Sequence, residues 1–427
     1  MTFDANLWHE TCGERPDVGP LEHDLTVDLA VIGGGFTGCA AALDAARQGA
    51  SVCLLEAETI GHGGSGRNVG LVNAGLWLPP DRVMDQMGRA AGLRLITALA
   101  EAPGLVFDLI GRESIACEAT RAGTLHLAHS AKGLRDLMSR HQQGVRLGAP
   151  ISLLDSAETA RRTGAAGFHG ALFDPRAGTV QPLGYVRGLA RAALATGAQV
   201  HVHSPVRALT HDQNLWRLDV NGRTVRARTL LVATNAYHLG IRDPFQPEFV
   251  PVHYCQFATE PLSAAQHATI LHGGEGCWDT ALVMSSLRRD RAGRLILGGI
   301  GNSAGFGGRL HAAWAARKLS ALFPTLDAQR FTHGWSGRIA MTHDHIPKIV
   351  QFGPRALACF GYSGRGIGPG TVFGQASARA LLTDSYEGLP VAPVTAHSEL
   401  FAPARSLFYE TGAALVHASA ARMPRRG

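Results

Sequence analysis

Lysine is scarce in this chain, because only Lys132, Lys318 and Lys348 occur among its 40 basic residues. The others are arginines, and no basic run is longer than two residues. The formal net charge is +6 over 427 residues, which is a small excess for this length. Proteins that bind nucleic acids usually carry a dense basic patch or stripe. We therefore expect no nucleic-acid partner.

Long apolar runs and paired cysteine motifs are also missing. No apolar stretch reaches the roughly 18 residues that suggest a membrane-spanning helix. The first ten residues are partly acidic and have no apolar core, so we expect no signal peptide. The seven cysteines are odd in number and contain no C-x-x-C, which indicates free thiols in a reducing compartment. We predict a cytoplasmic protein that does not associate with a membrane.

The first strong structural pattern is a βαβ unit near the start of the chain. Residues 27–32 are apolar and β-branched, which is typical of a buried strand. After a glycine-rich turn, the alanine-rich stretch 36–48 predicts a helix that stops at Gly49. Residues 51–55 predict the second strand, so the unit has the usual length of about 30 residues.

The rest of the chain alternates helical and strand-like patterns. Helices are expected within 81–165 and at 185–196, 314–323 and 374–383, a hairpin at Asn221-Gly222, and mainly strands from 249 to 301. This order predicts an α/β fold, with a discontinuous Rossmann-like domain and a smaller domain built on a mixed or antiparallel sheet. The predicted bounds are 24–90, 150–245 and 333–385 for the nucleotide-binding domain, 91–149 and 246–332 for the substrate domain, and 386–427 for a C-terminal tail.

A dinucleotide-binding fingerprint follows the first predicted strand. Gly33, Gly35 and Gly38 fit G-x-G-x-x-G, and Glu56 ends the second strand, where a carboxylate can accept hydrogen bonds from ribose. The alternative is a chance glycine-rich turn, against which the flanking strand and helix argue. The contacts expected here are Gly33, Gly35, Phe36, Thr37, Gly38 and Glu56. The fingerprint alone does not separate FAD from NAD.

The segment 61–70, with the sequence G-H-G-G-S-G-R-N-V-G, resembles a stretch of FAD-dependent amine oxidoreductases. Further similar stretches are Leu7-Trp8, 27–32, 259–262, 335–342 and 361–366, which follow one another in the family order. On these motifs the chain is similar to the D-amino-acid-oxidase and glycine-oxidase superfamily, and most similar to γ-glutamylputrescine-oxidase-like enzymes. The resemblance covers residues 7–385 and implies FAD as the cofactor. We expect non-covalent attachment, because 61–70 contains no cysteine and His62 is the only candidate there.

The resemblance also implies cofactor contacts in four later segments. The expected residues are Ser65, Gly66, Arg67, Asn68, Gly70, Val206, Thr234, Asn235, Gly364, Arg365, Gly366 and Ile367. Arg365 could place positive charge at the flavin N1/C2=O edge, which becomes negative on reduction. The alternatives are a solvated loop at 61–70, a surface ion pair for Arg365, and ordinary strand ends at Val206 and Thr234.

The substrate side is expected on the strand around residues 252–256 and at Arg338. Alternation puts His253 and Cys255 on one face and Tyr254 and Gln256 on the other, and one pair could line the pocket. The alternative is an ordinary strand with one wet face. Arg338 is the expected partner of a substrate carboxylate and Arg365 the second choice. However, the spacing from Arg338 to Asp344 differs by one residue from the glycine-oxidase pattern.

Metal binding is not expected from the sequence. His201 and His203 share a strand face, and His343-Asp344-His345 form a cluster, but neither group has a third ligand at a typical spacing. We interpret these histidines as surface residues.

The resemblance implies FAD-dependent oxidation of a C–N bond in an amine or amino acid, such as glycine, sarcosine, an iminodiacetate-like compound or a γ-glutamyl polyamine. Hydride transfer to flavin N5, hydrolysis of the imine and reoxidation by O₂ with release of hydrogen peroxide are expected. That hydride step needs no acid or base, so no catalytic residue is named. The alternatives are a dehydrogenase that passes electrons to a quinone or carrier protein, and a non-catalytic flavin-bound subunit. The sequence does not predict an oligomeric state.

Overall fold

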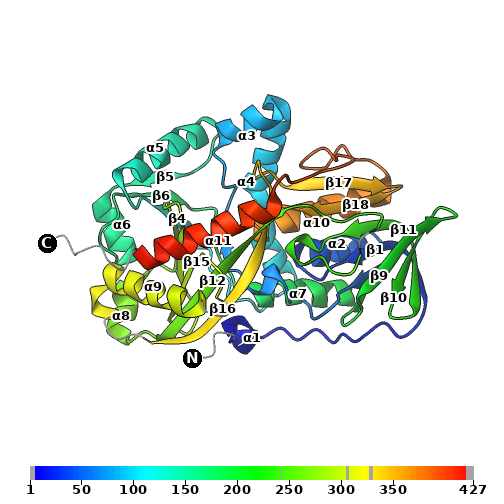
Figure 1. Cartoon of the computed structure of the whole chain (residues 1–427), viewed down its shortest axis with the longest axis horizontal. Helices are drawn as coiled ribbons and strands as arrows, with labels where there is room; N and C mark the ends of the chain where they lie inside the picture. The colour runs from blue at the N-terminus through cyan, green and yellow to red at the C-terminus, as the bar shows by residue number, and fades with distance from the viewer. Residues whose placement is uncertain (1–4, 242, 304–306, 327–329, 420–427) are drawn as a thin grey trace.

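Two eight-stranded sheets dominate the computed structural model, which describes residues 5–241, 243–303, 307–326 and 330–419. Figure 1 shows the first sheet and its helices in the right half of the molecule and the second sheet in the left half. A short ribbon of β3 (Leu71–Val72) and β7 (Gly178–Thr179) adds a third, two-stranded sheet. The predicted α/β fold is confirmed.

The first sheet is the nucleotide-binding half. Its strands are β1 (Leu25–Ile32), β2 (Val52–Leu55), β8 (Gln199–His201), β9 (Val206–Asp212), β10 (Leu215–Val220), β11 (Arg223–Val232), β17 (Lys348–Gly353) and β18 (Ala356–Phe360). The order is β17-β18-β11-β1-β2-β8, and every pair from β18 to β8 is parallel. The carboxyl ends of β1, β2, β11 and β18 therefore lie at one edge of this sheet, where ligands bind in open α/β sheets.

Three helices pack together on this sheet. They are α2 (Phe36–Arg47), α7 (Pro182–Ala195) and α10 (Ile367–Thr383), and α2 lies in contact with both of the others. Five of the 12 residues of α2 are alanines, and all five are buried, which permits close approach. The longer helix α4 (Arg89–Arg112) packs against α10. The predicted βαβ unit therefore forms the centre of this half.

The second sheet forms the other half. Its strands are β4 (Thr124–Leu127), β5 (Ser152–Leu154), β6 (Ala171–Asp174), β12 (Val250–Pro261), β13 (Gly276–Asp279), β14 (Ser285–Arg289), β15 (Arg294–Ile300) and β16 (Phe331–Met341). They follow the order β16-β12-β15-β14-β13-β4-β6-β5, and the pairing is antiparallel except between β13 and β4. A mixed sheet was predicted here.

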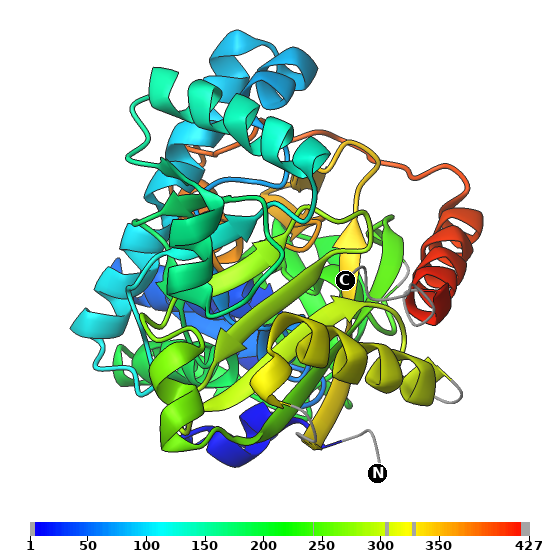
Figure 2. The ribbon, with the colours of Figure 1, turned by 90° about the vertical axis from the view of Figure 1, so that its left-hand side faces the viewer.

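Short helices surround the second sheet in Figure 2. They are α3 (Pro80–Met87), α5 (Ala131–Arg146), α6 (Ser156–Thr163), α8 (Ala264–Thr269) and α9 (Gly307–Leu322). The C-terminal helix α11 (Ala402–Ser419) packs against β12 and α9, and the short α1 (Leu7–Thr11) packs against α7. The predicted tail thus contains a docked helix, while its last residues, 420–427, lie outside the described residues.

Several elements differ from the prediction. β4 and β5 lie within the stretch 81–165, which was expected to be helical. β5, β6 and β16 join the second sheet, although the predicted bounds placed 150–173 and 333–341 with the nucleotide-binding half. β4 was not predicted because it pairs with β13, far along the chain, so that its strand character depends on non-local pairing.

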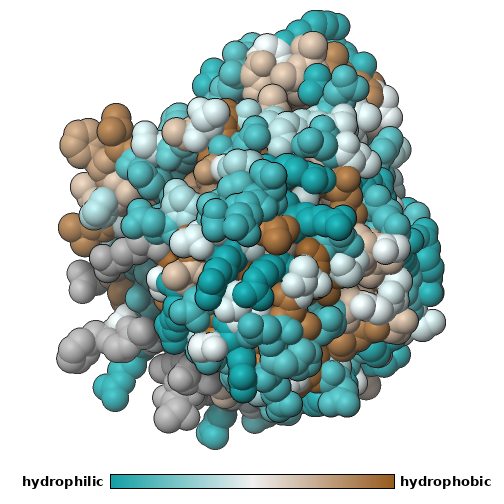
Figure 3. Space-filling model, turned by 90° about the vertical axis from the view of Figure 1, so that its right-hand side faces the viewer, coloured by the Kyte–Doolittle hydropathy of each residue, from teal (hydrophilic) through white to brown (hydrophobic). Residues whose placement is uncertain are grey.

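All seven cysteines are free and buried, as predicted for unpaired thiols. Among the described residues, no helix combines the length and apolar character needed to cross a membrane. Figure 3 shows a mostly hydrophilic face, with a group of hydrophobic side chains projecting at one edge.

Candidate active site

The turn after β1 requires glycine at two positions. Gly33 has φ +111°, and a side chain on it would press against the Ala233 carbonyl of the neighbouring strand end. A Cβ on Gly38 would overlap the carbonyl oxygen of Gly33. The missing side chain at Gly38 therefore lets α2 start directly over the turn, so that its amino-terminal N–H groups point into the space beyond β1.

Glu56 stands beside this turn, at the end of β2. One carboxylate oxygen accepts a hydrogen bond from the Gly34 N–H at 2.6 Å, and the other accepts one from the Glu58 N–H at 2.9 Å. These bonds fix the carboxylate next to the glycine turn. Each oxygen has a second lone pair that can accept a bond from a ribose hydroxyl.

A cavity of about 400 Å³ opens in front of the turn and extends between the two sheets. Of the predicted cofactor residues, those on its lining are Gly33, Gly35, Phe36, Thr37, Glu56, Ser65, Asn68, Val206, Thr234, Asn235, Gly364, Arg365, Gly366 and Ile367. Of the predicted substrate residues, Tyr254, Gln256 and Arg338 line it as well. Residues from distant parts of the sequence thus meet in one site, at the size typical of ligand pockets.

Four predicted cofactor residues do not belong to this lining, which comprises described residues only: Gly38, Gly66, Arg67 and Gly70. A Cβ on Gly66 would overlap the Gly61 carbonyl oxygen, and one on Gly70 would overlap that of Val180, so both glycines serve close packing. Arg67 donates to the His62 carbonyl at 2.8 Å and to the Ser336 carbonyl at 3.2 Å. It therefore holds the loop against β16, and the expectation of a direct cofactor contact is not supported for these residues.

The loop 61–70 is ordered by its own polar residues. Ser65 Oγ accepts a hydrogen bond from the Phe36 N–H at 3.0 Å, which ties the loop to the start of α2. Asn68 donates to the Gly64 carbonyl and accepts from the Gly70 N–H, at 2.9 and 2.8 Å. The alternative of a freely solvated loop is therefore wrong.

The start of α10 lies beside the start of α2 and also faces the cavity. Asn235 Oδ1 accepts a hydrogen bond from the Gly361 N–H at 3.0 Å, and the Tyr362 hydroxyl pairs with Thr37 Oγ1 at 2.8 Å. These contacts position the turn 361–366, which leads into the 17-residue helix α10. Gly366, the N-cap of α10, and Ile367, its first residue, line the cavity, so the positive amino-terminal end of this helix faces it. Two helix N-termini thus converge on one cavity, which fits an anionic dinucleotide cofactor.

The register of β12 against β16 decides which residues face the cavity. Tyr254 and Gln256 line it, whereas His253 points the other way and bonds to Glu410 of α11, with Nδ1 and Oε1 2.6 Å apart. Burial alone would raise the pKa of Glu410, but the hydrogen bond and the charge interaction with His253 outweigh it and hold this pKa below its ordinary value. The predicted substrate contact of His253 is therefore not supported. Alternation along β12 directs its side chain to the face of the sheet that α11 covers.

Arg338 shares its register position with His253. Side chains of residues that stand opposite each other in an antiparallel pair point to the same face of the sheet. Arg338 therefore points to the face opposite to that of Tyr254. Its guanidinium carbon lies 4.8 Å from the centre of the Tyr237 ring. Ile339, one residue further, pairs with Val252 and therefore occupies the face of Tyr254. The geometry favours Arg338 less than the sequence suggested.

Arg365 lies in an aromatic corner of the cavity. Its guanidinium carbon is 4.5 Å from the ring centre of Trp278 and 5.8 Å from that of Trp77. The His126 ring stacks on the Trp278 ring, with 4.8 Å between the two ring centres. Burial lowers the pKa of Arg365 to about 9, so it stays charged at neutral pH. Burial also holds the pKa of His126 well below its ordinary value, so that this ring is neutral. The alternative of a surface ion pair for Arg365 is not supported, because no ion pair of this residue occurs among the described residues and one of its guanidinium nitrogens is buried.

Five buried polar atoms on the cavity wall have no hydrogen-bond partner within the described part of the chain: Trp77 Nε1, Trp278 Nε1, Arg365 Nη1, Tyr254 OH and Gln256 Oε1. Buried polar groups are normally paired, so such a concentration marks a ligand site. Three of these atoms can only donate, and Gln256 Oε1 can only accept. Trp77 and Trp278 were not predicted from the sequence, because an aromatic residue near an apolar strand has the pattern of an ordinary core residue.

Comparisons with known proteins find similar sequences and similar structures. The sequence model of the family described as "FAD dependent oxidoreductase" matches residues 28–380. Similar proteins include the probable oxidoreductase OrdL of Haemophilus influenzae, which is 28% identical over 89% of both chains. Gamma-glutamylputrescine oxidoreductase of Escherichia coli is 28% identical over 81% of this chain and 82% of its own length. The crystal structure of glycine oxidase from Geobacillus kaustophilus superposes with a TM-score of 0.71 at 20% identity, covering 88% of this chain and all of that one.

Proposed function

Because the chain belongs to the family of FAD-dependent oxidoreductases, we propose that it oxidises a C–N bond in a primary or secondary amine or amino acid. FAD is the cofactor of this family, and the family resemblance predicted from the motifs is confirmed. One observation carries the proposal: the nucleotide-binding turn and a wall of unpaired buried polar atoms face the same cavity.

The unpaired atoms fit a substrate that carries both an anion and an amine. Arg365 Nη1 and the two indole N–H groups can donate to a carboxylate, and burial in an apolar corner strengthens such charge-assisted bonds. Gln256 Oε1 and the Tyr254 hydroxyl can accept from an amine N–H. The geometry thus favours Arg365 over Arg338 as the carboxylate partner. Glycine, sarcosine, iminodiacetate-like compounds and γ-glutamyl polyamines all have this combination of groups.

The residues that hold FAD in this proposal lie along the cavity from Glu56 and the start of α2 to the start of α10. When bound non-covalently, FAD supplies the hydride acceptor for C–H bond cleavage next to nitrogen. The chain itself orients the amine through Gln256 and Tyr254 and keeps water away with Trp77 and Trp278. Water then hydrolyses the imine product to a carbonyl compound and an amine or ammonia.

We also propose that O₂ is the electron acceptor, with release of hydrogen peroxide, and that the enzyme acts in the cytoplasm. The oxidase activity is supported by the name of glycine oxidase, to which this chain is 25% identical over 76% of its length. The location is supported by seven free, buried cysteines. A dehydrogenase that reduces a quinone or carrier protein is the competing function.

The test is reduction of the protein-bound flavin by amines in the absence of O₂. The purified chain is mixed with glycine, sarcosine, iminodiacetate and γ-glutamylputrescine, and with the matching carboxamides, while the flavin absorbance is followed. Bleaching by at least one acid is expected, followed by O₂ uptake and peroxide formation in air. Bleaching without O₂ uptake, but with reduction of a quinone, identifies a dehydrogenase. No bleaching by any amine contradicts the proposal and favours a non-catalytic subunit.

A further inference from the structure

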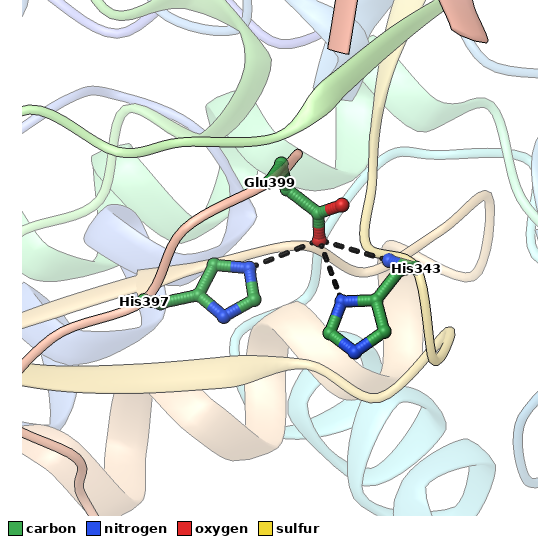
Figure 4. A group of neighbouring side chains, drawn as sticks. All are labelled: His343, His397 and Glu399. Atoms are coloured by element: carbon green, nitrogen blue, oxygen red, sulfur yellow. Dashed lines mark hydrogen bonds and ion pairs between the residues drawn. The ribbon is translucent and has the colours of Figure 1, made fainter. Parts of the chain in front are cut away.

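A second cluster of chemically reactive side chains lies outside the cavity. His343 begins the loop between β16 and β17, and His397 and Glu399 belong to the stretch between α10 and α11. Their candidate ligand atoms, two imidazole nitrogens and one carboxylate oxygen, all lie within 4.8 Å of one another. Figure 4 shows both rings turned towards the same oxygen of Glu399. The sequence indicated only His343 and two neighbours, because the other ligands come from far along the chain.

The contacts of Glu399 are crowded on one of its two oxygens. Oε1 accepts from the His343 N–H at 2.8 Å and lies 3.2 Å from His343 Nδ1 and 3.0 Å from His397 Nε2. Oε2 accepts from Arg405 at 2.7 Å. A carboxylate oxygen has two lone pairs, so three donors on Oε1 are one more than it can satisfy well. The Glu399 side chain is fully buried, and His343 is 59% exposed.

Each imidazole can carry its proton on the nitrogen that faces away from Glu399. The nitrogen near Oε1 then presents a lone pair and does not donate. A cation between the two rings and Oε1 would then replace both imidazole contacts and leave two donors, the His343 N–H and Arg405, to hold the carboxylate.

We propose that His343 Nδ1, His397 Nε2 and Glu399 bind a divalent transition-metal ion of the zinc class, with water on the exposed side. Two imidazoles and one carboxylate are a common protein ligand set for such ions. Arg405 on Oε2 and Phe360, whose ring centre lies 5.7 Å from that of His397, orient the ligands from behind.

The proposed ion fastens the C-terminal stretch to the first sheet. This stretch is already paired near its start, where the Gln351 N–H donates to the Val394 carbonyl at 2.8 Å and the Val394 N–H donates to that of Ile349 at 2.9 Å. His397 and Glu399 would add a second attachment, directly before α11. His343, His397 and Glu399 are not on the lining of the cavity, so the ion stabilises the fold and takes no part in the oxidation.

The test uses the untagged, full-length, FAD-loaded protein, stripped of metal with a chelator. Isothermal titration with Zn²⁺ alone should show one site, and saturating Zn²⁺ should raise the melting temperature. His343→Ala should weaken Zn²⁺ binding about tenfold or more, since a ligand matters at least as much as its supporting contacts. His343 is exposed, so this variant should fold. His397→Gln, which retains a hydrogen-bond donor, should lose the same affinity.

The matched control is His272→Ala, which removes an exposed histidine that is not in the cluster. It should bind Zn²⁺ as the unaltered protein does. The proposal is overturned if the unaltered protein shows no single Zn²⁺ site, or if the three variants lose affinity equally. It is also overturned if Zn²⁺ binds normally to His343→Ala.

Discussion

The guanidinium of Arg365 lies over the indole ring of Trp278, with 4.5 Å between the central carbon and the ring centre. One of its nitrogens is buried without a hydrogen-bond partner in the described part of the chain. A buried cation that contacts aromatic rings and no carboxylate lacks a charge partner. An anionic ligand can supply that partner. This relationship supports the proposal that the substrate carries a carboxylate.

Arg365→Gln should therefore raise KM for an amino-acid substrate while the flavin stays bound. Loss of a buried charge partner costs about 2–5 kcal/mol, which corresponds to a roughly thirtyfold or larger rise in KM. The matching carboxamide should be affected far less, because it has no charge to lose. Steady-state kinetics on both compounds measure this, with Arg338→Ala as the control. A larger effect in Arg338→Ala would return the role to that residue.

Glu56→Gln should weaken FAD binding without unfolding the protein. Glu56 already holds the Gly34 and Glu58 N–H groups, and the amide has only one oxygen to accept from these groups and the ribose. Charge-assisted hydrogen bonds contribute roughly 1.5–3 kcal/mol each, so affinity should fall at least about tenfold. Flavin fluorescence during titration of the apoprotein gives the dissociation constant. An unchanged constant would show that Glu56 does not contact the cofactor.

Two glycine-to-alanine substitutions should have opposite effects on stability. In Gly38→Ala the new Cβ would overlap the Gly33 carbonyl oxygen, so the turn must open and both FAD affinity and melting temperature should fall. In Gly104→Ala, inside α4, nothing lies within 4 Å of the new Cβ, and helix propensity should add up to about 1 kcal/mol of stability. Thermal unfolding with and without FAD compares them. Equal behaviour of the two variants would contradict the packing argument.

Acidification should loosen the C-terminal helix through His417. Burial lowers the pKa of His417 from 6.5 to about 3, and His417 Nδ1 lies 2.7 Å from Nδ1 of buried His311, where only one of the two can carry a proton. Between these pH values the undocked helix binds more protons than the docked one, so stability rises with pH and is lost below about pH 6.5. The loss at pH 5 should be about 2 kcal/mol.

Hydrogen exchange of residues 402–419 at pH 5 and 7.5, corrected for intrinsic rates, measures this opening. In His417→Phe, which can still stack on Trp314, most of the pH difference should disappear. Equal protection at both pH values in the unaltered protein would exclude His417 as the cause.

Local patterns predicted the nucleotide-binding half well. β1, α2 and β2 have unambiguous periodicity within about 30 residues, and the hairpin at Asn221-Gly222 depends on two adjacent turn residues. In contrast, β4 has four residues and owes its place to β13, whose partner residues lie some 150 positions later, as in the pair Thr124–Gly276. Such information is not present in any window of the sequence.

For the substrate side, the sequence left open which face of β12 lines the pocket. Alternation divided β12 into two sets of residues, but only the packing of α11 shows that His253 belongs outside and Tyr254 inside. Trp77 and Trp278 were missed because no residue-level signal separates a cavity wall from a core. The histidine cluster was missed for the same reason as β4, since its three ligands meet only after the C-terminal stretch has docked.

The cavity is lined by residues from Ile32 to Ile367, which has a consequence for synthesis on the ribosome. The glycine turn emerges among the first residues, but the loop after β18 that completes the pocket emerges only when most of the chain has been made. Domains form as their residues leave the ribosome, amino-terminal parts first. A prematurely terminated chain would hold the nucleotide fingerprint and still lack a place for the flavin ring. Cofactor uptake thus distinguishes finished molecules from fragments.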